Sequence, residues 1–338
     1  MGVTSADIAR ALGLHKATVC RVLRGGGRAS AETKERIIKM AQEMNYRPNQ
    51  LARSLSCGQS QFIGVLASPS IMPAFHLLID PIERSLSEQD YLMLFTRPSK
   101  SKEGMNIALD QLIANRVPGI IAVLSPSDRD TNAFKEVVDQ NVKLVVVNEP
   151  INGLEVPQIV CDDYKSVRIA TEHLISLGHR RIVYLAIPLD SERSRERAKG
   201  FTDAMKNAGL PVGTSSIVET ELSEEAGAQV MTRLLKRENP PTAVVARQDV
   251  VALGAMDAVF SAGLSVPQDV SIVGLGDMWR SNALRVPLTT IHYPFEEMAN
   301  RGAKILLRLL AGKSVPPKTE VMDAKLVLRS STAPPRKP

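Results

Sequence analysis

The feature that most constrains this chain is a long alternation, beginning at Phe62, of short apolar runs with helical patterns. Runs such as FIGVLA, GIIAVL and KLVVV are continuously apolar, which is typical of strands buried on both faces of a parallel sheet. The segments between them have the 3.6-residue apolar spacing of helices that cover such a sheet. The pattern therefore predicts an α/β fold with doubly wound sheets.

The alternation is long enough for two sheets. In the first set we expect FIGVLA, a helix with Ile79, Ile82 and Leu86, YLMLFT, a helix with Leu109 and Leu112, GIIAVL, a helix around Phe134 and Val138, and KLVVV. In the second set we expect a helix over 167–177, RIVYLA, a helix over 195–208, SSIVE, a helix over 224–236, TAVVA, a helix over 250–262, and VSIVG. Single cores stop growing near about 250–300 residues, so 338 residues favour separate lobes.

Excess positive charge is confined to the first sixty residues. They hold ten Lys and Arg against four Asp and Glu, a net charge of +6. This is the net charge of the whole chain, so the remaining residues are neutral on balance. A basic module joined to a neutral body is typical of a protein that binds a polyanion such as DNA. A solvated charged surface would give the same count, so the motifs must decide.

Three short helices are predicted in this basic module. Thr4 and Ser5 can cap the first, the second begins near Lys16, and Ser30 can cap the third, which runs through Glu43. The expected apolar positions are Ile8, Ala9 and Leu12, then Val19, Val22 and Leu23, then Ile37, Ile38, Ala41 and Met44. Two short helices joined by a tight glycine turn form a helix-turn-helix, whose second helix lies in the major groove of DNA.

Specific motifs then follow one another along nearly the whole chain. They are DIARALGLHKATVCRVLRGGGRASAETKERIIKMAQEMNYRPNQLARSL, FIGVLA, EHLISLGHRRIVYL, RERAKGF, DVVALGAMDAV, VPQDVSIVGLGD, PLTTI and RSSTAPP. In this order they resemble the LacI/GalR family of bacterial transcription regulators. The resemblance implies a DNA-binding headpiece and a core similar to periplasmic sugar-binding proteins, whose two lobes close on a small-molecule effector.

The resemblance also divides the chain. We expect a headpiece over 1–47, a hinge helix and linker over 48–60, an N-terminal lobe over 61–161 plus 291–322, and a C-terminal lobe over 162–290 plus 323–338. The hinge segment is too short to be a stable helix alone. In the family it folds when two subunits lie side by side on a pseudo-palindromic operator, and Leu55 matches the leucine inserted into the minor groove. A plain linker with a core leucine is the alternative.

The second helix of the headpiece matches the family's recognition helix. Lys16 and Ala17 occupy the positions that choose operator bases, and Arg21 supports or joins this readout. Arg and Lys donate to guanine O6 and N7, whereas Ala contacts the thymine methyl. Thr18 matches a phosphate-contacting position, and His15 stands where the family usually has a capping Ser. The other expected DNA contacts are Thr4, Arg24, Asn49, Ala52, Arg53 and Leu55.

In the core, ligands of doubly wound sheets lie outside the carboxyl ends of the strands. Arg197 in RERAKGF matches the family's cleft arginine, and Asp162 matches a cleft carboxylate that accepts from hydroxyls. At three positions where many family members carry a side chain that accepts hydrogen bonds from the ligand, this chain has Pro69, Met72 and Gly276. Arg193 adds a cation where relatives often have a small polar residue. The expected effector contacts are Met72, Phe75, Asp162, Arg193, Arg197, Gln248, Asp277 and Trp279.

These changes favour an anionic effector, such as a sugar acid or a phosphate ester, because guanidinium binds carboxylate and phosphate in a bidentate manner. We expect Arg193 and Arg197 to hold the anion and Asp162 to accept from a ligand hydroxyl. Alternatives remain open for single residues. Arg193 could be solvated, Trp279 could pack at the lobe surface, and Asp249 could merely cap the segment that follows it.

Other functional classes find little support. The sequence contains no nucleophile-elbow, Walker, HExxH or dinucleotide motif, and its histidines and cysteines lack metal-site spacing, so we expect neither an enzyme nor a bound cofactor or metal. No apolar run is long enough for a membrane span, and the N-terminus lacks a signal sequence, which favours the cytoplasm. A solute-binding protein and a DNA-binding protein without an effector remain the alternatives.

Overall fold

The structure is a computed structural model that describes residues 3–23, 26, 29–46, 60–68, 75–99, 101, 103–125, 131–189 and 192–336. For Phe75, Thr131 and Trp279 it describes the backbone only. The chain divides into an N-terminal compact unit and a second unit that holds nearly all of the chain from Phe62 onward. Each unit is described by itself.

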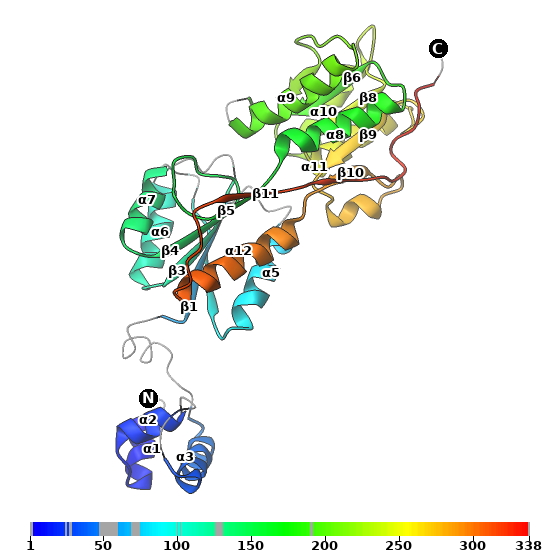
Figure 1. Cartoon of the computed structure of the whole chain (residues 1–338). Coiled ribbons are helices and arrows are strands. Elements are labelled where there is room, and N and C mark those ends of the chain that lie inside the picture. The colour runs from blue at the N-terminus through cyan, green and yellow to red at the C-terminus, as the bar shows by residue number, and fades with distance from the viewer. Residues whose placement is uncertain are drawn as a thin grey trace. The chain divides into compact units, whose positions relative to one another are not determined.

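The N-terminal unit consists of three helices in its described part (Figure 1). They are α1 (Ser5–Leu12), α2 (Lys16–Leu23) and α3 (Ala31–Glu43). Thr4 caps α1 by accepting from the Asp7 backbone N–H, and the Asp7 carboxylate accepts from the Thr4 backbone N–H in return. Gly13 ends this helix in the left-handed conformation, at φ 63°. Ser30 caps α3 by accepting from the Thr33 backbone N–H, so both predicted caps are present.

A small apolar core holds the three helices together. Its fully buried members are Ile8, Ala9, Val19, Val22, Ile37 and Ala41. One predicted core position is wrong, because Ile38 is 49% exposed. Adjacent helical residues point about 100° apart, so a stripe that buries Ile37 turns Ile38 toward solvent.

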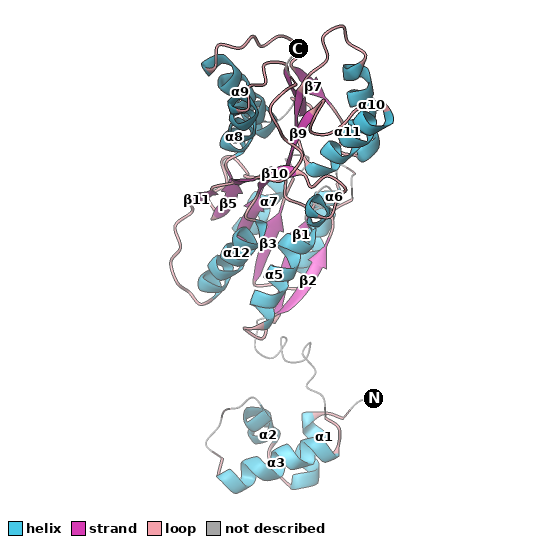
Figure 2. Ribbon diagram, turned by 90° about the vertical axis from the view of Figure 1, so that its right-hand side faces the viewer, coloured by secondary structure: helices cyan, strands magenta, loops and turns pink. Residues whose placement is uncertain are grey.

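The first lobe is built on a parallel sheet with the strand order β11-β5-β4-β3-β1-β2. The strands are β1 (Phe62–Ala67), β2 (Leu92–Thr96), β3 (Gly119–Val123), β4 (Lys143–Asn148), β5 (Gln158–Cys161) and β11 (Thr319–Met322). The helices are α5 (Phe75–Ser87), α6 (Gly104–Ala114), α7 (Thr131–Asp139) and α12 (Phe295–Leu310). Helices α5 and α12 pack together on one face, and α6 and α7 lie together on the other (Figures 1 and 2). In α7, Phe134 is buried as expected, but Val138 is 37% exposed and Val137 is buried instead.

The second lobe repeats this architecture with the strand order β12-β10-β9-β8-β6-β7, in which only β12 is antiparallel to its neighbour. The strands are β6 (Ile182–Ala186), β7 (Ile217–Glu219), β8 (Ala243–Ala246), β9 (Ser271–Leu275), β10 (Thr289–His292) and β12 (Lys325–Val327). The helices are α8 (Asp163–Ser176), α9 (Glu192–Asn207), α10 (Glu224–Leu235), α11 (Asp249–Ser261) and the short 3-10 helix η2 (Trp279–Asn282). Helix α8 pairs with α9, and α10 pairs with α11. The α/β class with two doubly wound sheets is therefore confirmed.

The chain passes between the lobes at the ends of β5, β10 and β11. β5 ends in the first sheet at Cys161, and α8 of the second lobe begins at Asp163. β10 remains in the second sheet as far as His292, two residues beyond residue 290, where the sequence placed the boundary, and α12 begins at Phe295. All three passages are short, which fixes the residues beside them at the junction of the lobes.

One glycine brings two helices of the second lobe into close contact. A Cβ added to Gly200 in α9 would collide with the backbone carbonyl oxygen of Tyr164 in α8. Only glycine permits this approach of the two backbones. Because Arg197 lies about one helical turn before Gly200, the close packing of α9 on α8 sets how near Arg197 comes to the first residues of α8.

Candidate functional site

The outer side of α2 carries the residues expected to read bases. Lys16, Ala17 and Arg21 are exposed, whereas Val19 and Val22 are buried on the opposite side. The Arg21 Nε donates to the Ala17 carbonyl at 3.2 Å, so the guanidinium lies along the outer face of the helix. This face offers the cationic donors that major-groove recognition of guanine requires.

His15 acts as a cap at the start of α2. Its Nδ1 accepts from the Ala17 backbone N–H at 3.3 Å, and its carbonyl accepts from the Thr18 N–H at 2.9 Å. The imidazole nitrogen therefore does what the oxygen of a capping serine does. A neutral ring that accepts at Nδ1 carries its proton on Nε2, which is a suitable donor to a phosphate oxygen.

Two further headpiece residues have structural partners. The Thr4 hydroxyl donates to the Asp7 Oδ2 at 2.7 Å, within the cap of α1. Cys20 is half-buried, and its Sγ lies 3.3 Å from the Ser5 Oγ, so this thiol packs α2 against α1. Contact of Thr4 with DNA stays a prediction.

Several expected site residues lie outside the described residues. They are Arg24, Asn49, Ala52, Arg53 and Leu55 for DNA, and Met72 for the effector. Phe75 begins α5 and Trp279 begins η2, and their side chains are likewise not described. The roles of all these residues stay predictions.

A buried cluster of charges lies where the lobes meet. Asp163, the first residue of α8, accepts from the Arg197 Nε at 2.6 Å and also pairs with Arg193. The Arg193 Nη1 reaches the Glu149 Oε2 at 2.9 Å, and Glu149 directly follows β4 of the first lobe. The side chains of Arg193 and Arg197 are only 9% and 6% exposed. Arg193 is therefore an ionic link between the two lobes rather than a solvated residue.

Tyr293 completes this cluster from the passage between β10 and α12. Its hydroxyl accepts from the Arg197 Nη2 at 3.2 Å and donates to the Asp163 Oδ1 at 3.3 Å. The ring packs on Phe295, with the two ring centres 5.4 Å apart. Burial raises the pKa of Tyr293, so the hydroxyl keeps its proton and remains a donor.

The two carboxylates respond differently to burial. Burial by itself raises the pKa of Asp163, but the charges of Arg193 and Arg197 outweigh it and hold the pKa below its usual range. Burial raises the pKa of Glu149, and the nearby Arg193 offsets this only in part. Two guanidinium groups therefore meet two carboxylates, and most of the charge of Arg193 is balanced within the protein.

Asp162 lies beside this cluster but has another contact. Its Oδ1 accepts from the Lys165 backbone N–H at 2.8 Å, which makes it the cap of α8. The carboxylate that binds Arg197 is the next residue, Asp163. No sequence motif singled out Asp163, Glu149 or Tyr293, although the Asp162-Asp163 pair after an apolar strand is a usable signal.

Asp277 is also held by protein groups. Its Oδ1 accepts from the Arg329 Nη2 at 2.6 Å, and its Oδ2 lies 3.0 Å from the His292 Nδ1. Its backbone has φ 53°, in the left-handed region, and lies in the loop after β9. A role of Asp277 in effector binding stays a prediction.

Asp249 fastens the same loop. This buried carboxylate accepts from the Met278 N–H and the Ser281 hydroxyl, both at 2.7 Å, and from the Thr290 hydroxyl at 2.5 Å. A Cβ on Gly274 would collide with it, so that glycine makes room for the contact. Asp249 thus anchors the loop that holds Asp277, which differs from the simple capping role considered from the sequence.

Arg247 and Gln248 follow β8, at the carboxyl end of the second sheet. The Arg247 Nη1 donates to the Thr220 carbonyl at 2.9 Å, but its buried Nε has no hydrogen-bond partner among the described residues. Gln248 precedes α11 without capping it by its side chain, and its buried Oε1 is likewise unpartnered there. Arg247 was not singled out from the sequence.

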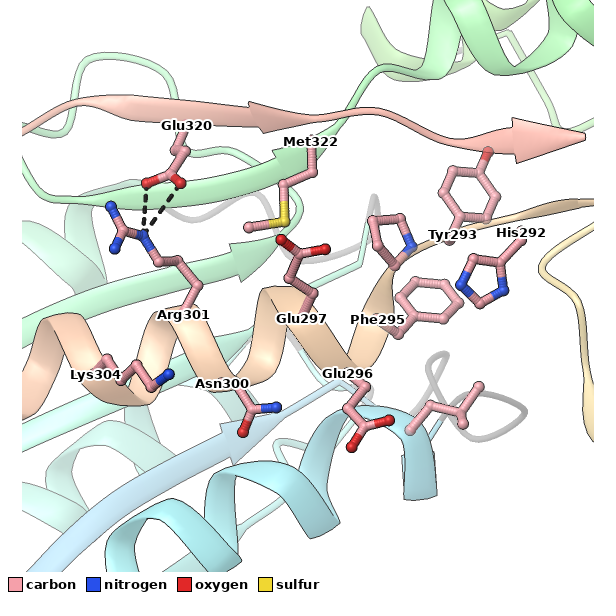
Figure 3. Close-up of a pocket in the computed structure, with 12 residues that line it drawn as sticks. His292, Tyr293, Phe295, Glu296, Glu297, Asn300, Arg301, Lys304, Glu320 and Met322 are labelled. Carbon is pink, nitrogen blue, oxygen red and sulfur yellow. Dashed lines mark hydrogen bonds and ion pairs between the residues drawn. The ribbon is translucent and has the colours of Figure 1, made fainter.

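A groove of about 650 Å³ runs along α12 and reaches Tyr293 of the charge cluster (Figure 3). His292 and Tyr293 lie at one end, and the Arg301 Nε binds both carboxylate oxygens of Glu320, at 3.1 and 2.9 Å. The remaining charged side chains that line the groove are Glu296, Glu297 and Lys304. Because acidic and basic groups are mixed, the groove favours no ligand charge.

Two absences apply to the part of the chain that the structure describes. There, no group of three or more His, Cys, Asp or Glu side chains is arranged to hold a metal ion. No described helix is both long and apolar enough to cross a membrane.

The two units together define a class of protein. A small helical unit with an exposed cationic second helix is the arrangement that reads DNA in the major groove. Two doubly wound lobes with charged groups at their junction form the architecture of a ligand-binding cleft. A chain that carries both is a DNA-binding transcription regulator that responds to a small molecule.

Comparison with known families makes the assignment specific. The pattern described as "Bacterial regulatory proteins, lacI family" matches residues 4–49, and that of a "Periplasmic binding protein-like domain" matches residues 171–332. The chain belongs to the LacI family of bacterial regulatory proteins, as its motifs indicated.

Individual relatives match over nearly the full length. The transcriptional repressor PurR of Actinobacillus pleuropneumoniae is 32% identical, over 97% of this chain and 98% of that protein. The regulator GalR of Escherichia coli is 30% identical, over 98% and 96%. The solved Lac repressor dimer bound to operator and the anti-inducer ONPF has a TM-score of 0.89 at 29% identity, over 98% of this chain and 100% of that one. These relatives are regulators and not enzymes.

Asp163→Asn removes the carboxylate shared by two buried arginines and should lower the free energy of unfolding by about 3–5 kcal/mol, the usual cost of an uncompensated buried charge. Asp162→Asn is the matched control, because asparagine caps a helix as well as aspartate does and should change stability by less than about 0.5 kcal/mol. Urea unfolding followed by circular dichroism measures both. Equal losses in the two variants would contradict this view of Asp163.

Proposed function

We propose that the protein is a repressor that binds a pseudo-palindromic operator as a homodimer and releases or tightens that binding when an acidic small molecule occupies its cleft. The observation that carries the DNA-binding part is the exposed cationic face of α2, with Lys16, Ala17 and Arg21. The Lac repressor structure that the chain resembles is a dimer on its operator. A two-fold symmetric dimer requires two half-sites related by the same symmetry. Its site of action is the nucleoid in the cytoplasm.

The effector part of the proposal is supported by the junction of the lobes. The Arg193–Glu149 pair connects the two lobes, so a ligand that binds beside it would change the energy of lobe closure. In a homodimer, closure would change how the paired first lobes meet and hence the spacing of the hinge segments. Effector and operator must then influence each other by the same factor.

The acidic character of the effector is supported by the charge balance. Arg193 and Arg197 lie in α9 and Arg247 follows β8, while Asp163 and Glu149 are the carboxylates that pair with the first two. These three arginines and two carboxylates together carry one positive charge in excess. A sugar-binding LacI-family regulator from Escherichia coli, 25% identical with a TM-score of 0.72, has been solved as a complex with phosphate. A DNA-binding protein without an effector is the alternative that the experiments must exclude.

The DNA-binding proposal predicts the effect of Arg21→Ala. An operator is first selected from random duplexes by the protein itself. The variant should then lose discrimination between that operator and random DNA by about 1–3 kcal/mol, the value of one bidentate base contact. Arg10→Ala, which removes an exposed arginine paired with Asp7 on α1, should preserve the ratio. Fluorescence anisotropy at fixed salt measures both affinities, and equal losses on the two DNAs would assign Arg21 to the phosphate backbone instead.

The effector proposal predicts selectivity between matched acids and neutral compounds. Gluconate should raise the melting temperature of the protein and glucitol should not, and the same should hold for glucose 6-phosphate against glucose. A ligand at 100 times its Kd stabilises the folded state by about 2.7 kcal/mol, which thermal unfolding resolves. The acidic effector is disproved if the neutral member of a pair stabilises as much as the acid. Stabilisation by no compound would favour the protein without an effector.

A further inference from the structure

The second lobe has a topological switch point between β6 and β8. β6 is the first strand of this sheet in the chain, and its neighbours are β7 on one side and β8 on the other, so the chain winds away from it in both directions. Ligands of doubly wound sheets bind outside the carboxyl ends of the strands at this point. Arg247 and Gln248 follow β8 directly and so lie at the switch point.

Arg247 spans the ends of three strands. Its backbone N–H donates to the Leu185 carbonyl of β6 at 2.9 Å, and its Nη1 donates to the carbonyl of Thr220, just after β7. The use of Nη1 leaves the edge formed by Nε and Nη2, and the buried Nε has no partner among the described residues. This edge is the one that binds a carboxylate or a phosphate through two parallel hydrogen bonds.

Arg247 differs from Arg193 and Arg197 because no described carboxylate balances its charge. Arg193 and Arg197 pair with Asp163 and Glu149, whereas no described carboxylate lies within ion-pair distance of Arg247. Burial, followed by the charge of Arg197, lowers the pKa of Arg247 to about 10, so the group remains charged at neutral pH. A partly buried cation without an anion is costly unless a ligand supplies one.

Two unpartnered oxygen atoms accompany this cation. The Gln248 Oε1 is buried and accepts no hydrogen bond from a described residue. The Tyr184 hydroxyl, in β6, is also buried without a partner there, and the charges of Arg197 and Arg247 lie near enough to act on its pKa. Burial raises the pKa of Tyr184 to about 12, which keeps the hydroxyl a donor. The set combines a cationic fork with one acceptor and one donor, as a hydroxylated acid would require.

We propose that Arg247 is the anion-binding residue of the cleft, that its Nε and Nη2 hold the carboxylate or phosphate group of the effector, and that the Gln248 Oε1 accepts from a neighbouring ligand hydroxyl. This inference rests on the proposed acidic effector and deepens it. It assigns the acid to Arg247 and leaves Arg193 to its link between the lobes.

The test uses the full-length protein and inorganic phosphate as the probe. Thermal unfolding is followed at constant ionic strength as phosphate replaces chloride, for wild type, Arg247→Met and Arg247→Lys. Phosphate should stabilise the wild type, and Arg247→Met should weaken the apparent phosphate affinity roughly ten- to a hundredfold, the range for a lost charged hydrogen bond. Arg247→Lys keeps the positive charge but lacks the two parallel N–H donors. Its apparent phosphate affinity should therefore lie between those of the wild type and Arg247→Met.

Arg233→Met is the matched control, because it removes an exposed arginine of α10 in the same lobe and should respond to phosphate as the wild type does. It also accounts for phosphate bound by the headpiece. Without phosphate, Arg247→Met should be at least as stable as the wild type, since it removes an unbalanced, partly buried cation.

The outcomes separate the two claims. If phosphate stabilises wild type and Arg247→Met equally, or does not stabilise the wild type, the assignment of the anion to Arg247 is wrong. If gluconate or glucose 6-phosphate nevertheless stabilises both proteins while the neutral analogues do not, the acidic effector stands without Arg247. If neutral analogues stabilise as well as the acids, the proposed effector class itself is wrong.

Discussion

The core of this protein depends on the ion pairs that the buried carboxylate of Asp163 forms with Arg193 and Arg197. This carboxylate lies at the first turn of α8, directly after the chain leaves the first sheet, and it holds Arg193 and Arg197 of α9. Through Arg193 the contact extends to Glu149 of the first lobe. Burying two guanidinium groups is tolerable only because carboxylates meet them. The same ion pairs that stabilise the second lobe therefore also connect it to the first. A change in these pairs would alter the contacts of both lobes.

Three arginines at this site have different contacts. Arg197 is held by Asp163 and Tyr293, Arg193 connects the lobes, and Arg247 retains the unbalanced charge at the switch point of the second sheet. A ligand that supplies an anion at Arg247 would lie near Arg197, whose charge acts on Arg247. In a family whose headpieces act in pairs, closure of the core is the event that can reach the DNA, because the hinge segment joins each headpiece to its first lobe.

The sequence predicted the architecture because its signals are local. Continuous apolar strands such as FIGVLA and the caps at Thr4 and Ser30 act within a few residues, and the structure has them where expected. The errors in predicting buried residues arose within single helical turns, where a shift of one residue decides whether a side chain is buried or exposed. Ile38 and Val138 lie one residue beyond the buried stripe of their helices. The charge cluster was only partly foreseen, because the pairing of Glu149 with Arg193 joins residues brought together by the tertiary fold, and no local pattern encodes that contact.

The central claim is that an acid in the core and an operator at the headpiece are coupled through closure of the lobes. The most direct test measures operator affinity by fluorescence anisotropy with and without a saturating concentration of the acid that stabilises the protein most, and acid affinity by calorimetry with and without operator. The account predicts that the acid changes operator affinity by about 5–150-fold, and that the operator changes acid affinity by the same factor. Operator affinity that is unchanged by an acid shown to bind the core would contradict it.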